Sequence, residues 1–148
     1  MFRGCSSLTT APELPATILA ESCYSGMFSG TNVLPDCSNI DFNSTSIVKS
    51  GGLGGLFSGT KVTDTDLNSI LPKNSNGKYC LPVTTLAEGC YEDMFTYCTS
   101  LTTAPELPAT TLAKSCYRSM FNGCYNLTTA PALPATKLAQ SCYSYMFC

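Results

Sequence analysis

The sequence has no histidine and no tryptophan, and only 12% of its 148 residues are charged. Without histidine it lacks the commonest general base, the usual partner of a serine or cysteine nucleophile, and the commonest zinc ligand besides cysteine. These absences argue against an enzyme. We expect a protein that performs no catalysis and needs no cofactor.

Two further absences limit the partners. Eight Lys and Arg residues stand against ten Asp and Glu, so no basic surface can neutralise phosphates and nucleic acid is not an expected partner. No segment reaches the ~18 uncharged apolar residues that a transmembrane helix needs. No positively charged segment followed by an apolar one opens the chain. We therefore expect no membrane insertion in this segment.

What the sequence does contain is a repeat. MFTYCTSLTTAPELPATTLAKSCYRS begins at Met94, and near-identical copies begin at Met1 and Met120, which sets a period of 26 residues. Two degenerate copies lie between the copy that begins at Met1 and the copy that begins at Met94. Such a period is typical of proteins built from stacked coils. The expected coils are residues 1–26, 27–55, 56–93, 94–119 and 120–145, with 146–148 opening the next.

Each regular unit has two halves. In the second half, apolar residues recur at i, i+1, i+4 and i+5, which predicts a short helix with one apolar stripe. Gly123 stands where a left-handed residue would end that helix, with Gly4 and Gly30 at the same phase. The first half, around Leu101, is predicted to be a short strand followed by a proline-stiffened crossover. One unit cannot bury its own stripe, so the units are expected to stack into a right-handed solenoid.

The phrase MF-x-x-C-x-x-L, followed by x-x-A-x-x-LP and a return to MF-x-G-C, resembles the BspA-like class of bacterial leucine-rich repeats. The resemblance covers 1–26 and 81–148 closely. It implies an α/β repeat fold, a right-handed leucine-rich-repeat solenoid of about five coils, each a short strand plus a short helix. It also implies a cell-surface, extracellular protein associated with adhesion. The residues that match the family's inward positions are Phe2, Phe95, Phe121, Cys5, Cys98, Cys124, Leu8, Leu101, Leu127, Leu14, Leu107 and Leu133.

The ten cysteines leave two interpretations open. Ten in a short extracellular chain would normally indicate a disulfide framework. Most, however, share one of two phases of the repeat, as Cys98 and Cys124 do, which favours rows of buried thiols that act as small apolar side chains. A zinc site is disfavoured, because the chain has neither histidine nor a C-x-x-C motif.

The third coil exceeds the period, and its surplus lies in a hairpin-like insertion at about 70–82. Here Asn74 to Gly77 form a turn cluster between apolar flanks, as in a hairpin loop. Insertions in repeat proteins often gather on the binding face. The candidate contact residues are therefore Lys73, Asn74, Asn76 and Lys78, with passive surface decoration as the alternative.

Just upstream, Asp64, Asp66 and Asn68 match the alternating oxygen ligands that begin a calcium-binding loop. The rest of that motif is missing, because Ser69 stands in place of the glycine and Ser75 in place of the final glutamate. Calcium is thus a weak candidate. A polar turn is the plainer interpretation.

Three other groups have structural interpretations. The glycines at 51, 52, 54 and 55 lack the spacing of a phosphate-binding loop and predict a looser, flexible turn in place of the helix. Glu92 and Asp93 are expected on a solvated face. A row of tyrosines is expected to pack at the helix edge rather than form a platform for sugars; its members are Tyr24, Tyr91, Tyr117 and Tyr143.

Two functions follow as expectations. The first is a non-enzymatic extracellular binding scaffold, a fragment of a bacterial cell-surface, adhesin-like protein that contacts protein or glycan partners on host or neighbouring cells. The second is a structural repeat module of a filament, surface layer or phage fibre, in which like subunits stack end to end. The second is favoured by open ends without the polar caps that solenoids use.

Overall fold

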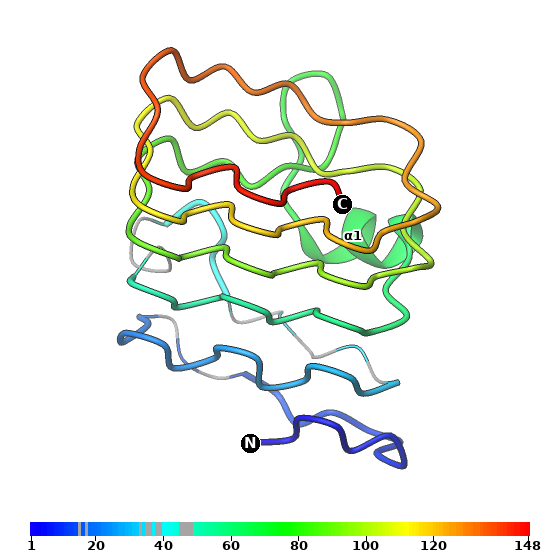
Figure 1. Cartoon of the computed structure of the whole chain (residues 1–148). Coiled ribbons are helices and arrows are strands. Elements are labelled where there is room, and N and C mark those ends of the chain that lie inside the picture. Colours follow the sequence, from blue (N-terminus) through cyan, green and yellow to red (C-terminus); the bar gives the residue numbers. More distant parts are fainter. Residues whose placement is uncertain (15, 17, 33, 35–36, 38–39, 45–48) are drawn as a thin grey trace.

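The computed structural model describes residues 1–14, 16, 18–32, 34, 37, 40–44 and 49–148, so the expected coil 27–55 lies partly outside the described residues. The chain winds into a stack of coils, with the first copy at one end and the last copies toward the other (Figure 1). Backbone hydrogen bonds join each coil to the next, as between Tyr117 N–H and the Cys142 carbonyl at 3.0 Å.

One side of the stack is made of consecutive tight turns. We call these segments the turn ribbons, residues 20–31, 49–60, 87–98, 113–124 and 139–148. Alternate amides donate to the carbonyl three residues earlier, as Met120 does to Tyr117 at 3.2 Å. Every fourth residue is left-handed, with φ of 53° at Ser119 and 71° at Gly123. A left-handed third residue is the mark of a type II turn, so each ribbon is a repeated turn of four residues.

The helix expected in the second half of each unit is therefore wrong. The left-handed backbone of Ser115 and Ser119 is incompatible with a right-handed helix. Their amides also donate to Gln140 and Ser144 of the following coil, whereas a helix would keep them inside the segment. The left-handed residue expected at Gly123 is present, but as part of a turn ribbon rather than as a helix cap.

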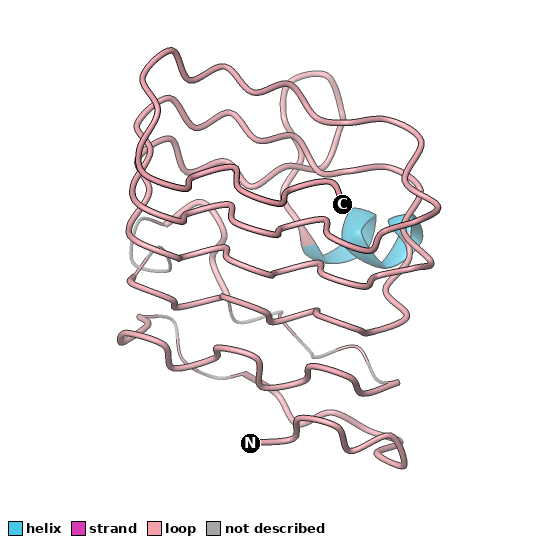
Figure 2. Cartoon of the chain, viewed as in Figure 1, coloured by secondary structure: helices cyan, strands magenta, loops and turns pink. Residues whose placement is uncertain are grey.

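The short strand expected in the first half is also wrong for the described part of the chain. Figure 2 draws none there, and neighbouring coils meet through isolated parallel bridges, as between Thr103 and Thr129. Prolines such as Pro105 and Pro108 interrupt the amides that a continuous ladder would need.

The long third coil carries the one helix of the described residues, α1, Asp64–Ile70. Thr63 caps it through a capping box with Asp66, and Leu67 is buried beneath it. A hairpin follows, in which Lys73 and Tyr79 form an antiparallel bridge and Gly77 has a φ of 74°. The surplus thus consists of α1 together with the hairpin that was expected at about 70–82.

Identical side chains stack through the core. Phe57, Phe95 and Phe121 lie with ring centroids 5.4 and 5.6 Å apart and nearly parallel. Tyr91 and Tyr117 stack at 5.9 Å and are fully buried, which confirms packing rather than a surface platform for the tyrosine row. Aromatic pairs at such separations add about 0.5–1.5 kcal/mol beyond their buried area.

Seven of the ten cysteines are buried, and the free thiols among them include Cys90, Cys98, Cys116 and Cys124. Cys98 and Cys124 do more than fill space, because their Sγ atoms donate to the carbonyls of Phe57 and Phe95 at 3.0 and 2.9 Å. At the same phase in another coil, Thr60 Oγ1 donates to the Phe57 carbonyl at 2.7 Å. Both residue types are small side chains with one donor, but the two cysteines bond to the preceding coil, whereas Thr60 bonds within its own coil.

Candidate functional site

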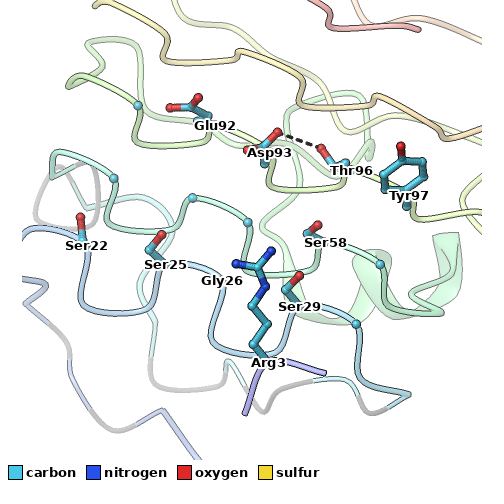
Figure 3. A pocket seen from close by; sticks show the side chains of 16 residues that line it. Arg3, Ser22, Ser25, Gly26, Ser29, Ser58, Glu92, Asp93, Thr96 and Tyr97 are labelled. Carbon is cyan, nitrogen blue, oxygen red and sulfur yellow. Dashed lines mark hydrogen bonds between the residues drawn. The ribbon is translucent and has the colours of Figure 1, made fainter. Parts of the chain in front are cut away.

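The outward face of the first ribbons is hollowed into a recess of about 640 Å³, which we call the turn-face trough (Figure 3). It crosses the ribbons 20–31, 49–60 and 87–98. Arg3 reaches in from the N-terminal side, and Glu92, Asp93 and Tyr97 stand on the opposite side. Small residues form its floor: Ser22, Ser25, Gly26, Ser29, Gly30, Gly51, Gly54, Gly55, Ser58, Gly59 and Gly89.

The trough exists because one outward row of the stack changes size. Ser25, Gly54, Glu92 and Arg118 occupy equivalent positions in successive ribbons, on the residue before the left-handed one. The first two ribbons place almost no side chain in this row, whereas the next two place long charged ones. The missing side chains leave the hollow.

The backbone of the floor also favours glycine. Gly55 and Gly59 have φ of 62° and 66°. A Cβ on Gly55 would lie 3.4 Å from the Cα of Gly26 in the neighbouring ribbon. The expected loose, flexible turn in this glycine-rich segment is wrong, because the ribbon is as regular as the others and buries Leu53 and Phe57 completely.

Charges of opposite sign lie on the two sides of the trough. Arg118 of the next ribbon holds Glu92 through Nη1 and Oε1 at 2.6 Å. Thr96 Oγ1 donates to Asp93 Oδ1 at 3.2 Å. Tyr97 is left-handed and keeps 55% of its surface exposed. The recess thus offers hydroxyls, one guanidinium, two carboxylates and an exposed aromatic ring.

A second recess, the hairpin cavity, has a volume of about 460 Å³. It lies between the insertion and the side of the coils that follow it. Its lining residues are Asn68, Gly77, Lys78, Tyr79, Thr103, Ala104, Glu106, Thr129, Ala130, Pro131 and Ala132.

Of the four expected contact residues, Lys78 lines the hairpin cavity, whereas Lys73, Asn74 and Asn76 line neither of these two recesses. The other three belong to the hairpin itself. Asn74 Oδ1 accepts the amides of Asn76 and Lys78 at 2.9 and 3.1 Å, so its side chain shapes the turn. Lys73 is exposed and lies outside the hairpin cavity.

The calcium candidates are divided between different partners. Asp66 accepts the amide and hydroxyl of Thr63 in the capping box. Asp64 accepts the backbone amides of Thr102 and Thr103 at 2.9 and 3.1 Å. Burial raises the pKa of Asp64, but hydrogen bonds from Thr102 and Thr103 outweigh it and leave that pKa below its ordinary value. These groups form a helix start and an anchor to the next coil, not a calcium-binding loop.

No group of three or more Cys, Asp or Glu side chains in the described part of the chain is placed to hold a metal ion. Among the same residues, no helix has the length and apolar character to cross a membrane.

The trough is not predicted by the sequence patterns above. Its signal was the serine or glycine at every fourth position of each ribbon, as at Ser22, Gly26 and Gly30, which marks left-handed turn residues. Glu92 and Asp93 were placed on a solvated face, and the structure puts them at the edge of this recess.

Comparison of the chain with protein-family models, with curated proteins and with solved structures finds no match.

Proposed function

We propose that this chain is a non-enzymatic extracellular binding scaffold from a bacterial cell-surface leucine-rich-repeat protein, and that it contacts a protein partner through the turn-face trough. The observation that carries the proposal is the trough itself, a wide polar recess whose two sides bear opposite charges. The leucine-rich-repeat assignment rests on the sequence resemblance. The stacking of copies 26 residues apart supports the repeat-solenoid part of this assignment.

The surroundings of the trough suit recognition by a preformed surface. Its amides are held by turn bonds and by bonds between coils, as where the Gly55 N–H donates to the Glu92 backbone carbonyl at 2.7 Å. A partner would therefore bind with little ordering of the backbone. A preformed backbone lowers the entropic cost of association. Arg3 and Tyr97 supply residue types that often dominate the energy of protein interfaces.

Filling the trough tests this function. Ser25→Arg places a long side chain over the floor, and the equivalent position in a later ribbon already holds Arg118, so the backbone tolerates it. Binding would be measured by biolayer interferometry against host matrix proteins, mucin glycoproteins and intact neighbouring bacteria. A protein that binds the unaltered chain should bind Ser25→Arg at least about tenfold more weakly, a loss of about 1.4 kcal/mol.

Ser144→Arg is the matched control, because it makes the same change at the same phase of the last ribbon, outside the trough. It should bind like the unaltered chain. The proposal fails if no partner in the panel binds, or if both variants bind as the unaltered chain does.

A structural module remains the second candidate, for one reason. The outer side of the last coil exposes apolar residues at phases that are covered in earlier coils, with Leu138 at 70% and Phe147 at 47% exposed. A second copy of this chain that packed on them would bury this apolar surface. Sedimentation velocity over a concentration series tests this idea. The sedimentation coefficient should rise with concentration as the chains assemble. A single monomeric species at all concentrations refutes it.

A further inference from the structure

We propose that the hairpin cavity is a binding site for a neutral pyranose saccharide. The cavity is lined by the insertion and by segments outside the turn ribbons. It shares no residue with the turn-face trough. The inference therefore stands independently of whether the trough contacts a protein.

The cavity is held open by the insertion. Tyr79 Oη donates to the Thr103 carbonyl at 2.7 Å, and this bond fixes the base of the hairpin against the fourth coil. Burial, with a smaller contribution from Asp64, raises the pKa of Tyr79 to about 12, so the hydroxyl stays protonated as the donor. The hairpin residues Gly77 and Lys78, which precede Tyr79, then line one side of the recess.

The charges in the cavity cancel. Lys78 Nζ and Glu106 Oε1 are the cation and the anion of the lining, and they pair with each other at 3.2 Å. A ligand with a net charge gains little here, because the exposed Lys78 and its partner Glu106 already neutralise each other. A neutral ligand can instead share both groups, as acceptor from the ammonium and donor to the carboxylate.

The remaining polar groups match hydroxyls. The Asn68 amide has no hydrogen-bond partner among the described residues and offers both a donor and an acceptor at the lining. Thr103 and Thr129, joined by a bridge between coils, bring two hydroxyl-bearing residues to the same wall. A ligand rich in vicinal hydroxyls satisfies such a set better than an apolar or an ionic one.

The lining also contains apolar residues. Ala104, Ala130 and Pro131 contribute small apolar surfaces, and the partly buried Tyr79 contributes an aromatic one. A pyranose ring has an apolar C–H face and a rim of hydroxyls, so it can meet both parts of this lining. The volume of about 460 Å³ lies within the roughly 300–1,000 Å³ typical of small-molecule sites.

The test is titration calorimetry of the intact chain with four uncharged probes: the methyl glycosides of glucose, galactose, mannose and N-acetylglucosamine. Methyl glucuronide and methyl glucosaminide serve as anionic and cationic counterparts of the glucoside. At least one neutral glycoside should bind saturably, and it should bind more tightly than either charged probe. Absence of saturable binding by all four, or tighter binding of a charged probe, overturns the proposal.

Two variants locate the site. Asn68→Ala removes the unpaired amide at an exposed helix position that suits alanine, and Ala130→Leu fills an exposed part of the lining. Each should weaken binding about tenfold, as expected for one hydrogen bond or one steric block.

Lys73→Ala, in the same hairpin but outside the cavity, and Ser25→Arg, in the trough, should bind the glycoside unchanged. Loss of binding in either control, or full binding in both site variants, overturns the assignment. Because Ser25→Arg is also the trough variant, failure of protein binding and failure of saccharide binding are read out separately.

Discussion

At the residue scale, burial controls the chemistry of the thiols. Burial raises the pKa of Cys90 and of Cys98 to about 12 and that of Cys124 to about 11. An ordinary cysteine has a pKa of about 8.5. The thiolate is the reactive form, so these three side chains are almost entirely unreactive near neutral pH. Cys5, Cys23 and Cys148 are exposed.

We predict that iodoacetamide at pH 8 labels Cys5, Cys23 and Cys148 of the folded chain and leaves Cys90 and Cys98 unlabelled over the same time. Peptide mass spectrometry measures each site, and the urea-unfolded chain, in which all ten should react, is the control. Labelling of Cys90 at the rate of Cys148 in the folded chain would contradict the structure.

The same pKa values fix the pH dependence of stability. A thiol whose pKa is higher in the folded state contributes stability that is fully present below about pH 8.5 and is lost as the pH rises toward 12. The urea midpoint should therefore be lower at pH 10 than at pH 7.5, and no such fall is expected between pH 6 and 7.5 from these groups.

At the element scale, the turn ribbon makes a prediction opposite in sign to that of a helix. Ser119 has a φ of 53°, a conformation that costs a residue with a side chain about 1–2 kcal/mol and glycine almost nothing. Gly26 and Gly55 already occupy this phase in other ribbons. Ser119→Gly should raise the free energy of unfolding by about 0.5–1 kcal/mol, measured by urea denaturation.

Asn122→Gly is the matched control in the same ribbon, because Asn122 does not have a positive φ. This change should destabilise the fold by roughly 0.5–1 kcal/mol through the extra freedom of the unfolded chain. A destabilising effect of Ser119→Gly would favour the helix that the sequence first indicated.

At the scale of the whole molecule, stability comes from each coil covering the last. Leu107 and Leu133 hold the same position in successive copies. Leu107 is 2% exposed and Leu133 39%. Leu107→Ala should cost about 2–5 kcal/mol, as for other buried leucines, and Leu133→Ala distinctly less. Urea denaturation measures both, and equal losses would mean that the stacking does not bury the first of them.

Much of the stacking could be predicted from phase alone. The recurrence of Phe95 as Phe121 implies that they stack, and the structure has their rings 5.6 Å apart. The local backbone could not be predicted in the same way. Apolar pairs spaced by four residues suit both a helix of 3.6 residues per turn and a repeated turn of four, and the apolar residues do not distinguish them.

The trough could not be predicted from the sequence. It is formed by side chains that are absent, at positions such as Ser25 and Gly54 that are separated by 29 residues and meet only through stacking. One wall of the hairpin cavity could be predicted from the sequence, because the insertion is evident there and contains Lys78. Its opposite wall, with Ala130 and Pro131, comes from a later copy that nothing in the insertion indicates.

The alternation of hydrogen bonds in the ribbons determines which insertions and deletions in the gene preserve the fold. The left-handed residues Ser22, Gly51, Gly89 and Ser115 open ribbons that are alike in length, while the connecting segments between them differ. Slippage of the coding sequence by one whole repeat adds or removes a coil and keeps the bonds between the ribbons in register. Deletion of a single codon within a ribbon shifts the four-residue phase, so length variation is confined to the connections, where the recesses acquire their distinctive walls.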